Sequence, residues 1–293
     1  MCNFPDLNCF LLKPDLSHKA GVEHVQAWLK YKAGTLMDNG KKVTDPDSSD
    51  AACDFYRIMW DDFLKNKGFR IHPKLVCHDE KSKVKCPNED PKKYVQGDWM
   101  CSVATTFGKG LIRFVKGKPL ENLFPKGKKG IDVELKTYVP ILLCDIACPY
   151  STKQFQEFWG DPVLQSFIRS AYTLANLIIV PDGFNTARYR PTQDYWDLTL
   201  EKYYEKKELL KYKGKDVSTP FHKLVEKSRA NGSDSLFLDE WLDKDNNPIP
   251  LLDKELNKPY KPDDWRKLMA EMTRRIDNRR VQMQARINQP MKR

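Results

Sequence analysis

Hydrophobic side chains recur at helical intervals over several stretches of the chain. In the clearest stretch five of them lie three, four or five residues from one another: Phe55, Ile58, Met59, Phe63 and Leu64. This spacing predicts a helix over residues 50–66. Ser48 or Ser49 can cap its start, and Gly68 follows its last periodic residue.

The same reasoning predicts further helices. Ser151 and Pro162 can each begin one, because Ser is a favoured N-cap and Pro fits the first helical turn. The second of these helices runs into a hydrophobic segment, 174–180, and the residues from Pro181 to Gly183 then force a turn. The remaining predicted helices cover residues 22–31, 193–211, 221–230 and 262–287.

Strand-forming residues concentrate in the middle of the chain. The ranges 98–107, 111–115 and 131–143 are rich in Val, Ile, Thr and aromatic residues and are separated by Gly-Lys segments. We therefore expect an α+β fold, mainly α-helical, with a small antiparallel sheet in the middle of the chain. No internal repeat interrupts this organisation.

Length and composition favour one domain. A chain of 293 residues with 40% hydrophobic content can bury a sizeable core. We expect a single globular domain over residues 1–293. Its subdivision would be an N-terminal helical part, a small sheet and a second helical part, over residues 1–95, 96–145 and 146–293.

Several features favour a cytoplasmic protein without a membrane span. No run approaches the roughly 20 apolar residues that a spanning helix needs, and the longest, 138–148, contains Pro140 and Asp145. The first residues lack the basic start and cleavage site of a signal peptide. In a reducing compartment the eight scattered cysteines are expected to be buried thiols.

The polar, proline-broken range 72–93 predicts a long surface loop. It contains Cys77, His78 and Cys86, which together with Cys101 are weak candidates for zinc ligands. The tight Cys-x-x-Cys pair of zinc ribbons and fingers does not occur here. We therefore expect no bound metal and no cofactor.

The charge balance introduces candidate partners. The chain carries 50 Lys and Arg against 40 Asp and Glu, a net charge of +10, which favours polyanions. Basic residues dominate the range 109–129, where Glu121 is the single acid and phenylalanines are interleaved. The candidate phosphate contacts are Lys109, Arg113, Lys116, Lys126 and Lys128. The alternative is a solvated hairpin edge that lysines protect from aggregation.

The predicted final helix is also basic. Arg275, Arg279 and Arg286 share one face, because they are four and seven residues apart. An apolar stripe is expected opposite them, formed by Leu268, Met272, Ile276 and Met283. An exposed arginine face would suit bidentate contact with phosphate. The alternative is an amphipathic helix docked on the domain with a charged outer face.

Polar residues crowd the loop from Phe184 onward into the next helix: Asn185, Arg188, Arg190, Asp194 and Asp197. Backbone N–H groups at a helix start favour the binding of an anion. The two arginines could also make bidentate hydrogen bonds to a phosphate. A structural interpretation remains open, in which Asp194 is an N-cap, Asp197 pairs with an arginine and Asn185 adopts a left-handed conformation.

The stretch YTLANLIIVPDGFNTARYRPTQDYWDLTLEKYY, residues 172–204, resembles a bacterial and phage-associated family of unknown function. The resemblance rests on the Asn-x-x-Arg pair and on Asp-x-x-Asp-Leu-Thr-Leu, and it extends to FYRIMWDDFLKNKG and MTRRIDNRRV. The resemblance covers about half of the chain. Around residues 76–130 the chain departs from the family pattern. The resemblance implies kinship and carries no established activity.

LANLIIV followed by Asn185 is also similar to part of some HNH-type restriction nucleases. Such enzymes need metal-binding and general-base histidines just upstream. No histidine lies between His78 and His222, so a nuclease would need His72 or His78 to fold back onto the loop.

The charge distribution predicts a protein that contacts nucleic acid, RNA or DNA, or another polyanion. The resemblance implies a bacterial protein with a role in phage defence or mobile-element conflict. One alternative is an enzyme acting on a nucleotide or phosphate-bearing substrate at Asn185, Arg188, Asp194 and Asp197. A second alternative is a protein-interaction module of the toxin–antitoxin type, using aromatics such as Trp241 and Trp265.

Overall fold

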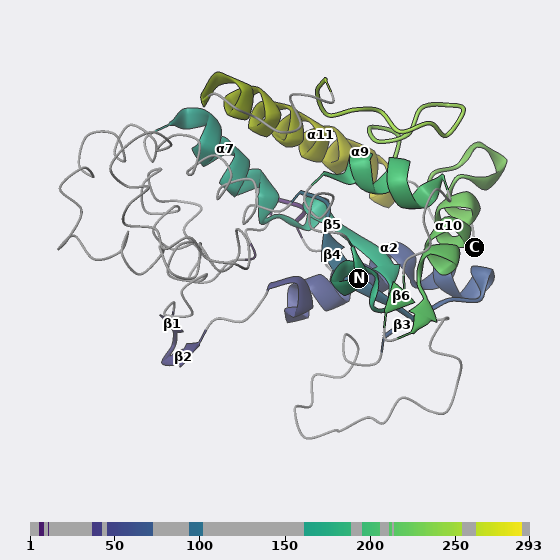
Figure 1. Ribbon diagram of the computed structural model, residues 1–293. Helices are drawn as coiled ribbons and strands as arrows, with labels where there is room; N and C mark the ends of the chain where they lie inside the picture. The colour runs from purple at the N-terminus through teal and green to yellow at the C-terminus, as the bar shows by residue number, and fades with distance from the viewer. Residues whose placement is uncertain are drawn as a thin grey trace.

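The computed structural model has an α+β fold that is mainly helical, as predicted (Figure 1). Within the described part of the chain three small sheets accompany the helices. The structure describes these ranges: 6–8, 11, 37–42, 46–72, 94–101, 161–188, 195–205, 211–212, 214–253 and 262–288.

Helix α2 spans Asp50–Lys67 and confirms the helix expected from hydrophobic spacing. Ser49 is its N-cap and accepts a hydrogen bond from the backbone N–H of Ala52 at 3.4 Å. Gly68 ends the helix with φ 77°, a left-handed conformation that glycine adopts without steric cost. The buried face of α2, which includes Tyr56 and Trp60, packs into the core.

The central sheet has the strand order β3-β4-β5. Strand β4, Tyr94–Trp99, pairs in parallel with β3, Arg70–Ile71, and antiparallel with β5, Leu177–Pro181. The sheet is therefore mixed, and the expectation of a purely antiparallel sheet is corrected. Strand β5 escaped prediction because all five of its residues are buried, which removes the alternation that marks a half-buried strand.

The expected strand range 98–107 overlaps β4 only at its last two residues. The other two expected strands, 111–115 and 131–143, lie outside the described residues. Two small hairpins complete the sheets, β1 with β2 and β6 with β7. Their bounds are Met37–Asp38, Lys41–Lys42, Lys211–Tyr212 and Lys215–Asp216.

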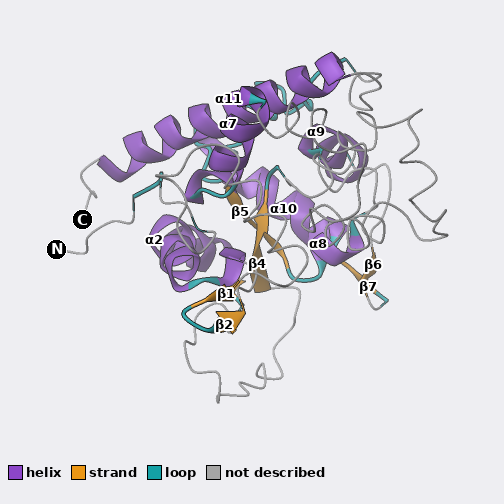
Figure 2. Cartoon of the chain, turned by 90° about the vertical axis from the view of Figure 1, so that its left-hand side faces the viewer, coloured by secondary structure: helices purple, strands orange, loops and turns teal. Residues whose placement is uncertain are grey.

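Helical elements cover the central sheet on both faces (Figure 2). Helix α2 lies on one side of β4 and β5, and α8 and α10 lie on the other. Helix α8 spans Phe184–Ala187, α9 spans Trp196–Thr199 and α10 spans Ser218–Ser228. Gly97 faces Tyr56 of α2, so its neighbour Asp98 points to the opposite layer.

A pair of packed helices completes the fold, α7 over Pro162–Ala171 and α11 over Pro262–Asn288 (Figures 1 and 2). Asp161 caps α7 by accepting the backbone N–H groups of Val163 and Leu164 at 2.9 and 3.3 Å. The same carboxylate pairs with Arg266 of α11. One acidic side chain therefore starts α7 and fastens α11 to it. The short helices η1, η4 and η7 span Pro46–Ser48, Leu174–Asn176 and Ala230–Gly232.

Two sequence expectations need correction. The helix expected over 193–211 is α9 followed by a π-helix over Leu200–Tyr204, and Lys211 belongs to β6. The expected subdivision after residue 95 falls inside β4. A single hydrophobic cluster also contains residues from both sides of that boundary, from Leu7 to Met283. The expected helices over 22–31 and from Ser151 lie outside the described residues.

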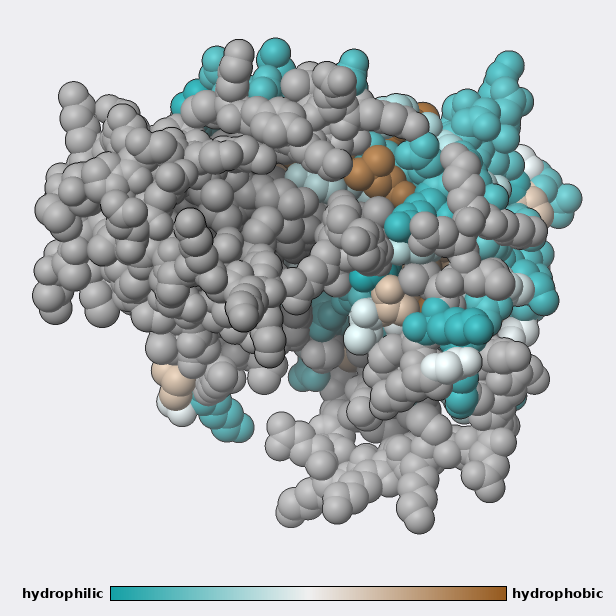
Figure 3. Space-filling view, viewed as in Figure 1, coloured by the Kyte–Doolittle hydropathy of each residue, from teal (hydrophilic) through white to brown (hydrophobic). Residues whose placement is uncertain are grey.

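Hydrophilic residues cover most of the described surface on the face seen in Figure 3. Among the described helices, none combines the length and apolar character that crossing a membrane requires.

Candidate functional site

A buried ion pair connects the sheet to the loop that carried the candidate site residues. Arg188, directly after α8, places Nη2 3.2 Å from Oδ2 of Asp98 in β4. The two side chains are only 2% and 3% exposed. Removing two charges from water is costly, and mutual attraction recovers this cost only with good geometry and further hydrogen bonds.

An aromatic cluster adjoins this pair through Trp196. The guanidinium carbon of Arg188 lies 5.2 Å from the ring centroid of Trp196, within the range of a cation–π contact. The indole Nε1 of Trp196 donates to the carbonyl oxygen of Trp99 at 3.2 Å. Phe184 stacks on Phe221 with 4.3 Å between centroids and also contacts Trp196. Trp196 therefore links the buried guanidinium to the aromatic cluster.

Asp197 has a different role from the one expected. It is 3% exposed, and its Oδ2 accepts the backbone N–H of Leu251 at 2.9 Å. Arg188 pairs with Asp98 and not with Asp197. The expected pairing of Asp197 with Arg188 is therefore wrong, whereas the alternative partner, Arg190, lies outside the described residues. Asp197 instead ties α9 to the segment around residue 251.

The other loop candidates are less informative. Asn185 lies inside α8 and is half-buried, while the left-handed conformation belongs to Gly183, with φ 81°. Arg190 and Asp194 lie outside the described residues. Tyr195 is the N-cap of α9 and makes no side-chain capping bond.

Two nitrogens of Arg188 stand out in the cluster. Nε and Nη1 are buried and have no hydrogen-bond acceptor among the residues that the structure describes. Buried N–H groups are nearly always paired, because an unpaired one costs about 1–3 kcal/mol. The π-helix over Leu200–Tyr204 follows α9 directly, and such segments are rare and often found at functional sites. Asp98, Arg188 and Trp196 therefore form the candidate site.

Asp98 was not among the residues singled out from the sequence. It lies in the strand-forming stretch YVQGDW. An acidic residue buried in a strand needs a partner. An acidic residue within a strand-forming stretch could therefore have identified Asp98 as a site residue. The expected strand began at Asp98, which made this residue look like a polar strand end.

The structure also places the α11 arginines differently from the expectation. Arg275 and Arg279 are each 1% exposed, so they do not form an exposed phosphate-binding face. The expected apolar stripe is confirmed as buried, but the two arginines extend it, since Arg275 lies three residues after Met272 and Arg279 four residues before Met283. Arg286 is exposed.

Both buried arginines bind backbone carbonyl oxygens. Arg279 donates from Nη1 to Ala175 and Leu177, both at 2.6 Å, and from Nη2 to Leu236 at 3.0 Å. Burial lowers the pKa of Arg279 to about 9, which leaves it charged at pH 7. Arg275 donates to the carbonyl oxygens of Ile249 and Pro250 and lies over Trp241. These contacts fasten α11 to the core.

Three other arginines of α11, which are partly or fully exposed, are paired with acids. Arg266 contacts Asp161 and Asp263, Arg274 contacts Glu240 and Glu271, and Arg280 contacts Asp277. These acids neutralise three positive charges on the outer side of the helix. The helix therefore presents a mixed surface and not a basic one.

The remaining candidates fall outside the described residues. They are Lys109, Arg113, Lys116, Lys126, Lys128, Cys77, His78 and Cys86. Within the described ranges no group of three or more His, Cys, Asp or Glu side chains could hold a metal ion. The nuclease hypothesis would bring His72 onto the loop that carries Arg188. The ring of His72 contacts Tyr94 edge-on, with 5.8 Å between centroids. Arg188 contacts Asp98 and Trp196.

Comparisons with protein-family models, curated proteins and solved structures return no match to this chain.

Proposed function

We propose that the protein binds a polyanion, namely nucleic acid, in the cytoplasm, through the lysine-rich range 109–129. The observation that carries this proposal is the distribution of charge along the chain. The described residues contain slightly more Asp and Glu than Lys and Arg, although the whole chain has a net charge of +10. The cationic excess therefore belongs to the other ranges.

The range 109–129 is the most one-sided of these, with seven basic residues and the single acid Glu121. Closely spaced lysines displace counterions from a phosphate backbone, and interleaved phenylalanines can stack on bases. Helix α11 contributes little to this binding. Two of its arginines are buried and three are paired with acids: Arg275 and Arg279, and Arg266, Arg274 and Arg280.

The test is a binding titration of fluorescent single-stranded RNA and DNA at several salt concentrations. A variant in which Lys109, Arg113, Lys116, Lys126 and Lys128 are replaced by Gln should bind at least tenfold more weakly. Its slope of log affinity against log salt should fall by several units, because each neutralised phosphate contributes about 0.7 for single strands.

The matched control replaces Lys267 and Arg286, two exposed cations of α11, and should lower the affinity much less. Equal losses in both variants would favour a diffuse charge effect. An unchanged affinity in the five-residue variant would contradict the proposal. A protein partner that is retained in a pull-down after nuclease treatment, in the absence of nucleic-acid binding, would favour the interaction-module alternative.

A further inference from the structure

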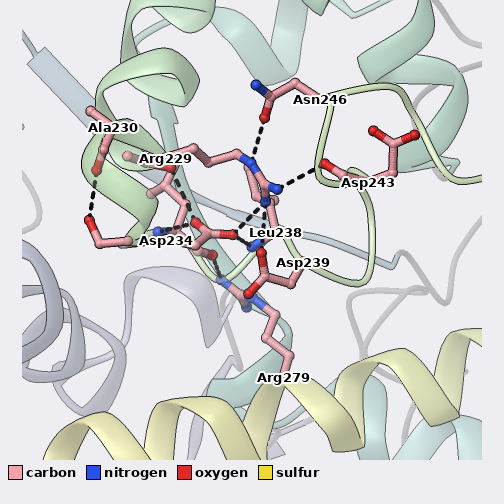
Figure 4. A network of polar contacts seen from close by, with 11 residues as sticks. Arg229, Ala230, Asp234, Leu238, Asp239, Asp243, Asn246 and Arg279 are labelled. Atoms are coloured by element: carbon pink, nitrogen blue, oxygen red, sulfur yellow. Dashed lines mark hydrogen bonds and ion pairs between the residues drawn. The ribbon is translucent and has the colours of Figure 1, made fainter.

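Four arginines with largely buried side chains can be compared within the described part of the chain, and three of them are well supplied with acceptors. Arg229 donates to Asp234, Asp239, Asn246 and the carbonyl oxygen of Asp243 (Figure 4). Arg275 has three acceptors, one of them on Glu271. Arg279 has three carbonyl acceptors, and only its Nε lacks one among the described residues.

Arg188 departs from this pattern. Within the described ranges its one polar contact is the 3.2 Å approach of Nη2 to Asp98, and Nε and Nη1 have no acceptor there. The side chain is 2% exposed, so water at the surface does not serve these groups. The fold therefore holds a guanidinium in place, fixed by Asp98 and Trp196, with N–H donors left over.

We propose that Arg188 binds a small oxyanion, a carboxylate or phosphate group, through Nε and Nη1. An oxyanion supplies the acceptor oxygens that these donors lack, and guanidinium–oxyanion hydrogen bonds are about twice as strong as neutral ones. The ligand is a small molecule and not a polymer, because the burial of Arg188 excludes the backbone of a nucleic acid.

The charge arrangement has a counterpart within the same molecule. Nη1 of Arg229 bridges two carboxylates, Asp234 and Asp239, at 3.0 Å each. Arg188 would likewise bridge Asp98 and the ligand. Two anions on one guanidinium leave one net negative charge, so a singly charged ligand fits better than a doubly charged one. The burial of Arg188 and Asp98 strengthens each contact, because electrostatic attraction is stronger away from water.

The experiment measures thermal unfolding of the full chain with increasing sodium acetate or inorganic phosphate, against sodium chloride at equal ionic strength. The wild-type melting temperature should rise and saturate with at least one of the two oxyanions, because a ligand that binds only the folded state stabilises it. Saturation with acetate alone assigns a carboxylate, and saturation with phosphate alone assigns a phosphate group. Arg188→Gln should abolish the rise, and Arg286→Gln should keep it.

Arg188→Gln can fail to fold, so a second measurement follows the wild type directly. The 15N resonance of Arg188 Nε, assigned by its disappearance in Arg188→Lys, should shift with the same saturation curve. No saturable response to either oxyanion, or an equal response in Arg188→Gln, would overturn the proposal. The variant with five Gln substitutions in range 109–129 should respond like the wild type, so this result is independent of nucleic-acid binding.

Discussion

The hydroxyl of Tyr56 occupies the space that a Cβ atom on residue 97 would need. Gly97 lies in the middle of β4, and Tyr56 lies in α2 and donates its hydroxyl to the carbonyl oxygen of Asp47 at 2.9 Å. A helix and a strand thus approach as closely as glycine permits. This contact sets the distance between α2 and the sheet. Asp98, the next residue of β4, lies on the opposite face of the sheet.

Gly97→Ala should destabilise the protein by at least about 1–3 kcal/mol, the usual cost of overpacking a core. Tyr56→Phe should not rescue it, because ring carbons of Tyr56 are also too close to the added methyl group. Urea unfolding measures the effect. A Gly97→Ala protein as stable as the wild type would show that α2 and β4 can separate freely. Gly68→Ala, which strains only a helix end, is the control and should cost about 1 kcal/mol.

Arg279→Met should lower the free energy of unfolding by about 3 kcal/mol or more, since three backbone carbonyl oxygens lose their donor. Arg279→Lys should lose less, because an ammonium group keeps three N–H donors. Arg286→Gln, at an exposed position of the same helix, should change stability by less than about 0.5 kcal/mol. Similar melting temperatures for all three variants would contradict a core role for Arg279.

Asp197→Ala should cost about 1–3 kcal/mol, because it leaves the buried N–H of Leu251 without its acceptor. Asp197→Asn should cost less, since the amide oxygen can accept the same bond. Hydrogen exchange at the Leu251 amide checks the mechanism, and it should accelerate in the Ala variant more than in the Asn variant. A silent Asp197→Ala substitution would show that the hydrogen bond from Leu251 does not contribute to stability.

Glu271 gives a pH-dependent prediction. Burial alone would raise its pKa, but hydrogen bonds from Arg274 and Arg275 outweigh burial and lower the pKa below its ordinary value of 4.5. The folded state therefore favours the charged form, and the resulting stability is complete above the unfolded pKa and lost as pH falls through the folded one. The difference in melting temperature between wild type and Glu271→Gln should be largest near pH 7 and shrink below pH 4.5.

The control is Glu226→Gln, at an exposed position of α10, which should change the melting temperature little at either pH. A Glu271→Gln difference that stays constant from pH 7 to pH 3 would show that the carboxylate charge does not contribute.

The sequence alone determined the elements that depend on neighbouring residues. Helix α2, with Ser49 at its start and Gly68 at its end, follows from local spacing and capping chemistry. The turn after Pro181 and the long helix α11 follow in the same way. These features depend on interactions within a few residues, and such interactions are visible in a linear pattern.

Only the tertiary structure decided which charged residues are buried and what they contact. Arg279 reads as one more cation on a basic helix, yet its acceptors lie more than 40 residues away in the chain. Arg188 read as a partner for Asp197 or for phosphate, but the strand pairing of β4 with β5 brings Asp98 to it instead. The physical reason is that burial and ion pairing depend on contacts between distant segments, which local periodicity does not encode.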